Sequence, residues 1–216
     1  MSDRYAEVRH DVWLHARQMW EQGLVVGSAG NVSRRAGDRH IAITPTSIPY
    51  DRMRAEEVVI VDLATGEAVE SIAPPSGELP MHRIVYNARP DIGALVHTHA
   101  PFITTLSVLR LPLPPIIDEM FLHLGGTIEV SDYAFTGTEA VGENAVAALG
   151  QRAGVILANH GNLCVGRDLD RALHAAIVME SCARVYVQAL QIAPPAPLPL
   201  SAEEAGLRMY DERRRR

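Results

Sequence analysis

The stretch GALVHTH, Gly93 to His99, decides how the chain is interpreted, because it joins an apolar run to two closely spaced histidines. The apolar residues are typical of a buried β-strand. Side chains on a strand alternate between its faces, so His97 and His99 are expected to project from one face near the strand's end. Two imidazoles side by side repel when both are protonated, and a shared divalent cation would remove that repulsion. The spacing therefore predicts two ligands of a metal site, although two unrelated histidines would give the same pattern.

Helices and strands are interleaved along the rest of the chain. Apolar spacing predicts helices over residues 3–22, 78–88, 101–109, 138–149 and 169–191, with a short helix near Ser201. Strands are predicted over residues 40–44, 58–62, 93–99, 154–159 and 163–166. Some strands follow one another too closely for crossover helices, which favours a mixed sheet covered by helices. The sequence predicts one α/β domain over residues 1–192 and a Pro-rich and Arg-rich tail over 193–216.

Composition excludes several classes of protein. The 216 residues are 47% hydrophobic and 21% charged, as in ordinary globular domains, and the formal net charge is −6. General binding to nucleic acid or to anionic membranes is therefore not expected. The basic run Arg213 to Arg216 is interpreted as a solvated tail. No apolar signal core or membrane span is evident, and Cys164 and Cys182 suggest neither a disulfide framework nor a thiolate metal site, so we expect a cytoplasmic protein.

A third metal ligand is expected from outside the His97–His99 pair. Catalytic zinc sites usually take three protein ligands and keep a fourth position open. His160 is the best candidate, because it ends the apolar strand of ILANHGN and precedes a glycine, where the chain turns. The strand before it can lie beside the strand that ends at His97. That arrangement would bring the three rings together.

Glu78, in PPSGELPMH, is the candidate for proton transfer. It opens a predicted helix, where the helix dipole alone would favour a carboxylate. Beside a metal site, the same carboxylate could instead move a proton.

Two loops have the composition of anion-binding sites. GSAGNVS at residues 27–33 offers backbone N–H groups and small side chains, and TPTS at 44–47 offers hydroxyl groups. Ser76 precedes the helix of Glu78. Each loop alone is more often only a turn, but together they would suit a phosphate group.

Five segments occur in an order that resembles the class II aldolase/adducin family: GNVSRR, ITPTSIPY, PSGELPMH, VHTHAPF and ANHGNLCVG. SDYAFTGTE at 131–139 and the final helix, which ends in ARVYVQAL, add to this likeness. The resemblance covers about residues 5–192. Within the family, the chain is most similar to the fuculose-phosphate aldolases.

The resemblance implies a fold, a metal and a set of site residues. The fold would be a three-layer α/β/α sandwich around a largely antiparallel mixed sheet. His97, His99 and His160 would bind one Zn²⁺ per subunit, and Glu78 would be the catalytic acid/base. The substrate phosphate would be held by Gly30, Asn31, Thr46, Ser47, Ser76 and Gly77, the last of which replaces a serine of the family. Similar members are homotetramers with active sites between subunits.

The implied reaction is cleavage of a ketose 1-phosphate, of the fuculose 1-phosphate or 5-deoxypentulose 1-phosphate type, to dihydroxyacetone phosphate and a small aldehyde. The chain has no lysine, which excludes a Schiff-base aldolase. Glu119 stands where the fuculose-phosphate enzymes have a proton-donating tyrosine and is a second catalytic candidate, whereas Tyr210 has no secure counterpart. The apolar stretch 111–122 favours a deoxygenated aldehyde.

Other activities of the family remain alternatives. They are a sugar-phosphate epimerase, a methylthioribulose-1-phosphate dehydratase and a decarboxylase, and a non-catalytic adducin-like interaction module is a further alternative. Retention of the three histidines and Glu78 disfavours the last of these.

Overall fold

A seven-stranded sheet forms the centre of the protein in the computed structural model, which describes residues 4–215. The strand order is β4-β3-β2-β1-β5-β7-β6, and every neighbouring pair is antiparallel. The strands are β1 (Asn31–Ala36), β2 (His40–Ile43), β3 (Val59–Asp62), β4 (Ala68–Glu70), β5 (Ala94–Thr98), β6 (Gly154–Leu157) and β7 (Gly161–Gly166).

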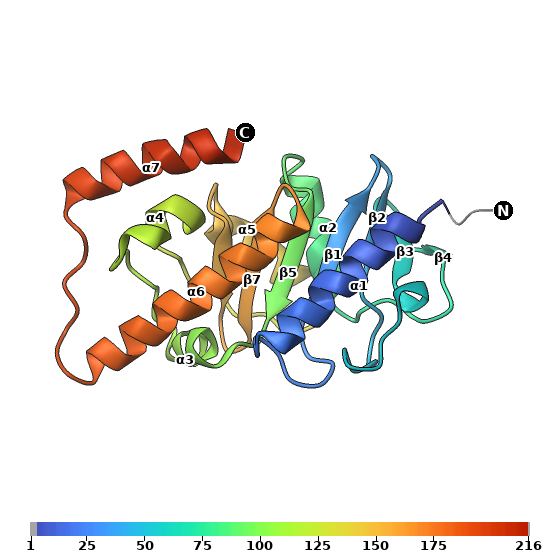
Figure 1. Ribbon diagram of the computed structural model, residues 1–216, viewed down its shortest axis with the longest axis horizontal. Coiled ribbons are helices and arrows are strands. Elements are labelled where there is room, and N and C mark those ends of the chain that lie inside the picture. The colour runs from blue at the N-terminus through green and yellow to red at the C-terminus, as the bar shows by residue number, and fades with distance from the viewer. Residues whose placement is uncertain (1–3, 216) are drawn as a thin grey trace.

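Helices cover both faces of the sheet. Figure 1 shows α1 (Ala6–Glu21) and α6 (Leu169–Leu190) crossing the near face, with α2 (Leu79–Ala88) and α5 (Glu139–Leu149) behind it. The other helical elements are the 3-10 turn η1 (Ala55–Glu57) and the helices α3 (Pro101–Leu109), α4 (Asp118–Leu124) and α7 (Leu200–Arg215). The architecture is therefore a three-layer sandwich, as expected from the resemblance. None of the helices in the described part of the chain combines the length and hydropathy needed to cross a membrane.

Strand β5 shows how the sheet separates two apolar cores. Ala94 and Val96 belong to the core beneath α1 and α6, whereas Leu95 belongs to the core beneath α2 and α5. Because side chains alternate along a strand, His97 lies on the same face as Leu95, toward α2. The sandwich thus directs His97 toward the beginning of α2, where Glu78 lies.

Most predicted elements are confirmed within two or three residues. The helix at 101–109 has the expected bounds, and the largely antiparallel sheet is observed. Among the described residues, the single parallel pairing is an isolated bridge between Val130 and Ile156. The sequence pattern predicts neither β1, β4, α4 nor η1: β1 has the polar sequence of a loop, and the other three elements are at most seven residues long.

The tail carries a longer helix than expected, and this helix packs on the body of the protein. α7 has 16 residues and contacts α4. A Cβ atom at Gly206 would lie 2.4 Å from Phe121, so only glycine permits this approach without rearrangement. Tyr210 is buried and its hydroxyl donates to the Gln151 carbonyl at 3.3 Å. The tail is therefore docked along this helix.

Candidate active site

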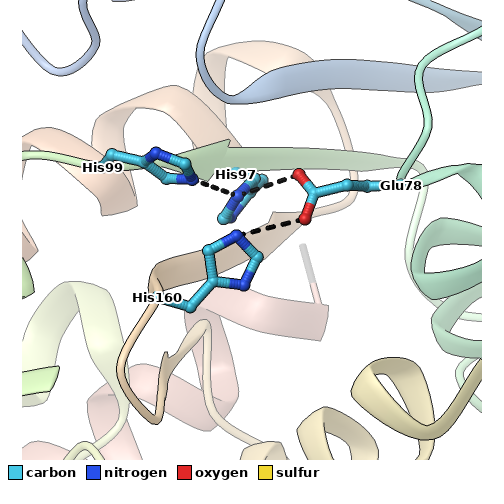
Figure 2. A group of neighbouring side chains, drawn as sticks. All are labelled: Glu78, His97, His99 and His160. Atoms are coloured by element: carbon cyan, nitrogen blue, oxygen red, sulfur yellow. Dashed lines mark hydrogen bonds and ion pairs between the residues drawn. The ribbon is translucent and has the colours of Figure 1, made fainter. Parts of the chain in front are cut away.

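Three histidines and one glutamate converge where β5 ends and α2 begins (Figure 2). Nε2 of His97 lies 2.9 Å from Nε2 of His99 and 3.1 Å from one carboxylate oxygen of Glu78. Nε2 of His160 lies 3.1 Å from the other oxygen. One ligand atom from each of the four residues lies within 4.8 Å of the other three. The two nearest imidazole nitrogens can face each other at this distance only by sharing a proton or a cation.

A backbone carbonyl orients the ring of His97, and a tight turn places His160. Nδ1 of His97 lies 2.8 Å from the Asn162 carbonyl, to which it donates when Nε2 is the free nitrogen. This second hydrogen bond is typical of metal-binding histidines, because it fixes the tautomer and the ring plane. The turn before His160 uses a left-handed residue, Asn159, with φ 55°. A Cβ at Gly161 would lie 2.3 Å from the Thr98 carbonyl, so glycine lets β7 approach the end of β5.

Both oxygens of Glu78 also accept hydrogen bonds from neutral side chains. The Asn31 amide donates to Oε2 at 2.7 Å and the Thr136 hydroxyl to Oε1 at 2.9 Å. The backbone N–H of Glu78 donates to the Ser76 hydroxyl at 3.3 Å. The carboxylate is therefore oriented from two sides. Thr136 is a site residue that sequence reasoning missed, although it lies within the SDYAFTGTE segment.

A buried row of polar side chains continues from Glu78 into the core. Because a carboxylate only accepts, the Asn31 NH₂ group must face Glu78, and Asn31 Oδ1 therefore accepts from His82 Nε2 at 2.5 Å. His82 Nδ1 then accepts from the Ser33 hydroxyl at 2.6 Å. The Ser33 oxygen in turn accepts from Tyr86 at 2.9 Å. Every donor in this row points toward the carboxylate. Sequence reasoning missed His82 and Tyr86, which only helical spacing after Glu78 could have suggested.

Burial and neighbouring charge shift the pKa values of this cluster. Burial alone raises the pKa of Glu78, but the rings of His97 and His160 outweigh it and hold that pKa below its usual range. Burial, assisted by the other two rings, lowers the pKa of His99 to about 4. Burial lowers the pKa of His82 to about 3. At neutral pH the site therefore presents an ionised carboxylate beside His99 in its neutral, cation-binding form.

A cavity of about 460 Å³ opens beside the cluster and contains most of the predicted site residues. Glu78, His99 and His160 line one side of it. The loop residues expected to hold phosphate also line it: Gly30, Asn31, Thr46, Ser47, Ser76 and Gly77. His97 is completely buried behind this wall. Of the described residues, no arginine lines this cavity.

Main-chain hydrogen bonds join the loop at 44–47 to the segment 74–76 that precedes Glu78. Ser76 N–H donates to the Thr44 carbonyl and Thr46 N–H to the Pro74 carbonyl, both at 3.1 Å. Gly30 has φ 72°, and a Cβ there would lie 2.5 Å from the His97 carbonyl. The Gly30 loop therefore requires glycine to lie this close to β5.

Glu119 is not brought to this cavity by the fold of a single chain. It lies exposed in the first turn of α4 and is absent from the cavity wall. The apolar stretch 111–122 does not line the cavity either. Tyr133, Ala134 and Phe135 supply its apolar part instead. Sequence reasoning missed these three residues, although they lie within the SDYAFTGTE segment.

Comparisons with known proteins agree with this geometry. The Class II Aldolase and Adducin N-terminal domain model matches residues 10–187. The chain belongs to the class II aldolase and adducin family. It is 37% identical over 203 residues to the 5-methylthioribulose-1-phosphate/5-deoxyribulose-1-phosphate aldolase of Rhodospirillum rubrum, covering 94% of this chain and 90% of that protein.

Two further similar proteins are named as L-fuculose phosphate aldolases. The L-fuculose phosphate aldolase of Escherichia coli is 37% identical over 187 residues, which are 87% of this chain and 85% of that protein. A solved L-fuculose 1-phosphate aldolase superimposes with a TM-score of 0.90 at 32% identity, covering 95% of this chain and 96% of that one. The family resemblance read from the sequence is thereby confirmed, over nearly the whole chain.

Proposed function

We propose that this chain is a metal-dependent aldolase that cleaves a ketose 1-phosphate to dihydroxyacetone phosphate and a small aldehyde. The observation that carries the proposal is the cavity with two chemically different ends. The His/Glu cluster lies at one end, and hydroxyl and glycine loops without any lining arginine lie at the other. Relatives named for aldol cleavage of such substrates support the same assignment.

The four clustered side chains fit a divalent cation. Three imidazoles and a carboxylate are the ligand types that zinc prefers, and the His97–His99 approach of 2.9 Å is suited to a shared cation. We propose Zn²⁺, one per subunit, held by His97, His99 and His160. When bound, the ion would act as a Lewis acid that stabilises negative charge developing on substrate oxygens.

Glu78 would move the proton at the reacting carbon. When the C3–C4 bond of the ketose breaks, its electron pair stays on C3, which must gain a proton to give dihydroxyacetone phosphate. Glu78 would deliver this proton and, in the reverse direction, remove it from C3. Asn31 and Thr136 would keep the carboxylate pointed at that carbon through their bonds of 2.7 and 2.9 Å.

The hydroxyl proton on C4 must leave as the aldehyde forms, and a second group is needed to take it. Glu119 stays our candidate for this role. Since it lies exposed and outside the cavity of its own chain, it would act from a neighbouring subunit. This role goes with the proposed homotetramer, whose active sites would lie between subunits. Phe135, which lines the cavity and is 71% exposed, is an apolar surface that such a contact would cover.

The polar loops would hold the phosphate group through Thr46, Ser47 and Ser76, with Gly30 and Gly77 allowing its oxygens to approach the main chain. Asn31 lies at the boundary between this end and Glu78. Tyr133, Ala134 and Phe135 would face the aldehyde part of the substrate, and their apolar character favours a deoxygenated aldehyde. The 5-deoxypentulose 1-phosphate type of substrate therefore suits this cavity best.

An aldol-addition screen tests the proposal. Purified enzyme, with its metal content measured, is supplied with dihydroxyacetone phosphate and either lactaldehyde, acetaldehyde or glycolaldehyde. We expect a new ketose 1-phosphate with the deoxygenated aldehydes and about one zinc per chain. Conversion of an added pentulose phosphate to its epimer without C–C cleavage would instead support an epimerase. Absence of both metal and turnover would support a non-catalytic module.

We also propose that the enzyme is cytoplasmic and does not bind nucleic acid or membranes, in keeping with its net charge of −6.

A further inference from the structure

A second cavity lies at the opposite end of strand β7 from the histidine cluster. Its volume is about 720 Å³, and residues of β7, α4, α6 and α7 contribute to its wall. β7 begins at Gly161, next to His160, and ends at Gly166, which lines this cavity. Six residues of extended chain span roughly 17–20 Å. The arrowhead of β5 and the helix α7 likewise lie at opposite edges of the molecule in Figure 1.

Arginines dominate the wall of this second cavity. It is lined by two aspartates, Asp91 and Asp170, and by six arginines: Arg89, Arg152, Arg167, Arg171, Arg213 and Arg214. With histidines neutral, the wall carries an excess of four positive charges in a chain whose formal net charge is −6. Three carboxylates outside the wall, Glu129, Asp168 and Asp211, pair with its arginines and offset up to three of these charges. Clefts lined by one sign of charge concentrate ligands of the other sign. The charge distribution therefore indicates an anionic ligand.

At the inner side of the cavity, one carboxylate is shared between two arginines. Asp91 Oδ2 lies 2.7 Å from Arg89 and 3.4 Å from Arg214. Arg214 also donates to Gln151 at 2.5 Å. Its Nε is buried without a hydrogen bond to any described group, since the carboxylate of Asp211, at 4.0 Å, is too far away to accept one. A buried N–H without an acceptor is costly, and an anion in the cavity could supply one.

At the mouth of the cavity, a second aspartate is likewise shared between two arginines. Asp168, just outside the wall, lies 3.3 Å from Arg167 and 3.7 Å from Arg171. Asp170, which lines the wall, is paired with His15 of α1 at 3.1 Å. The side chains of Arg167 and Arg171 are each more than 40% exposed. Their guanidinium groups are therefore accessible to a ligand that enters from solvent.

Most of the remaining wall is apolar, although His123 and His174 also line it. Ile92, Leu122, Val165 and Tyr210 line the cavity beside the arginines. A wall that is apolar on one side and cationic on the other suits a molecule with a carbon skeleton and charged groups at one end. A volume of about 720 Å³ is large enough for a molecule of nucleotide size.

We propose that this cavity binds an organic phosphate with at least two negative charges, separate from the substrate. Its phosphate oxygens would contact the arginines of α6 and α7, because planar guanidinium groups match phosphate oxygens in pairs. Its carbon skeleton would lie against Ile92, Leu122 and Tyr210. Arg213 and Arg214 thereby become part of a binding site. The expectation that they form a solvated tail is wrong for Arg214, which is packed against Gln151 and Asp91.

Calorimetric titration of the metal-loaded enzyme with adenosine monophosphate, pyrophosphate, inorganic phosphate and adenosine tests the proposal. We expect the phosphorylated compounds to bind, adenosine monophosphate more tightly than inorganic phosphate, and adenosine not to bind. Hydrogen exchange then locates the site. Protection should appear at residues 167–174 and 205–214, whereas occupancy of the substrate cavity protects residues 44–47 and 76–78. Protection confined to the latter two segments, or no binding by any probe, would overturn the proposal.

A double substitution supplies the second arm of the test. Arg171→Gln with Arg213→Gln removes two exposed cations from the mouth without touching the core. Affinity for adenosine monophosphate should fall at least about ten-fold, since charge-assisted hydrogen bonds contribute that much or more. Arg52→Gln is the matched control, because this side chain is 81% exposed and lies outside the cavity wall. Unchanged affinity in the double variant would also refute the assignment.

Discussion

Replacing Asn31 by alanine separates two roles that this residue could have in the site. The sequence suggested a phosphate contact. In the structure, its side-chain amide donates to Glu78 at 2.7 Å, and its oxygen accepts from His82 at 2.5 Å. Asn31 is 2% exposed, so its side chain is held by these two hydrogen bonds rather than by solvent. We therefore expect the substitution to act on the orientation of Glu78 and on the rate of the chemical step.

The size of the effect follows from the hydrogen bond that is lost. Hydrogen bonds to charged groups contribute about 1.5–3 kcal/mol. If the whole of that contribution is made in the transition state, kcat falls by roughly 10- to 150-fold, because each 1.36 kcal/mol corresponds to a factor of ten. The variant also leaves the N–H of His82 without its acceptor in a buried position. We expect this to lower the melting temperature while zinc remains bound.

Steady-state kinetics with a phosphorylated ketose distinguish the two roles, and zinc content confirms an intact metal site. Positioning of Glu78 predicts a lower kcat with little change in KM. It also predicts slower exchange of the C3 hydrogen of dihydroxyacetone phosphate with solvent deuterium. Thr46→Val is the matched control, since Thr46 lines the phosphate end of the same cavity and should mainly raise KM. A raised KM with an unchanged kcat in Asn31→Ala would refute the reasoning.

Three further expectations follow from the same site. Glu78→Gln keeps the size of the side chain but not its proton transfer, so turnover and deuterium exchange should fall roughly a hundred- to ten-thousand-fold with zinc still bound; exchange at the wild-type rate would exclude Glu78 as the base. His97→Ala removes a proposed ligand that is fully buried, and metal analysis should show a large loss of zinc compared with His10→Ala, an exposed histidine outside the cluster. His82 has its pKa lowered from 6.5 to about 3 by burial, so the unfolded chain binds the proton first and stability falls as the pH drops below 6.5. Between pH 7 and 5.5 this proton binding should lower the free energy of unfolding by on the order of 1 kcal/mol. Denaturant unfolding of His82→Gln should therefore depend less on pH than unfolding of the wild type. Equal pH dependence in the variant and the wild type would mean that His82 is not held neutral.

Local sequence patterns determined much of the site. The spacing of His97 and His99 on an apolar strand predicted that the two rings would meet, and their Nε2 atoms lie 2.9 Å apart. The glycine after His160 predicted a turn, and the turn places that ring against Glu78. The first prediction holds because the two-residue period of a strand is a local property. The turn itself is made by Asn159, with φ 55°, whereas Gly161 is required for the close approach of β7 to the Thr98 carbonyl. The order of the motifs also predicted the family, because motif order is a property of the linear sequence and requires no knowledge of tertiary contacts.

Only the tertiary structure decided which side chains share the Glu78 carboxylate. Asn31 and Thr136 reach it from 47 and 58 residues away along the chain, and neither contact has a periodic signature. β1 was missed because its polar residues face the buried row of His82 and Tyr86, where hydrogen bonds rather than apolar contacts satisfy them. The docking of α7, which brings Arg214 to the second cavity, depends on a close contact between Gly206 and Phe121. Such contacts arise when distant segments pack, so the pattern of neighbouring residues does not encode them.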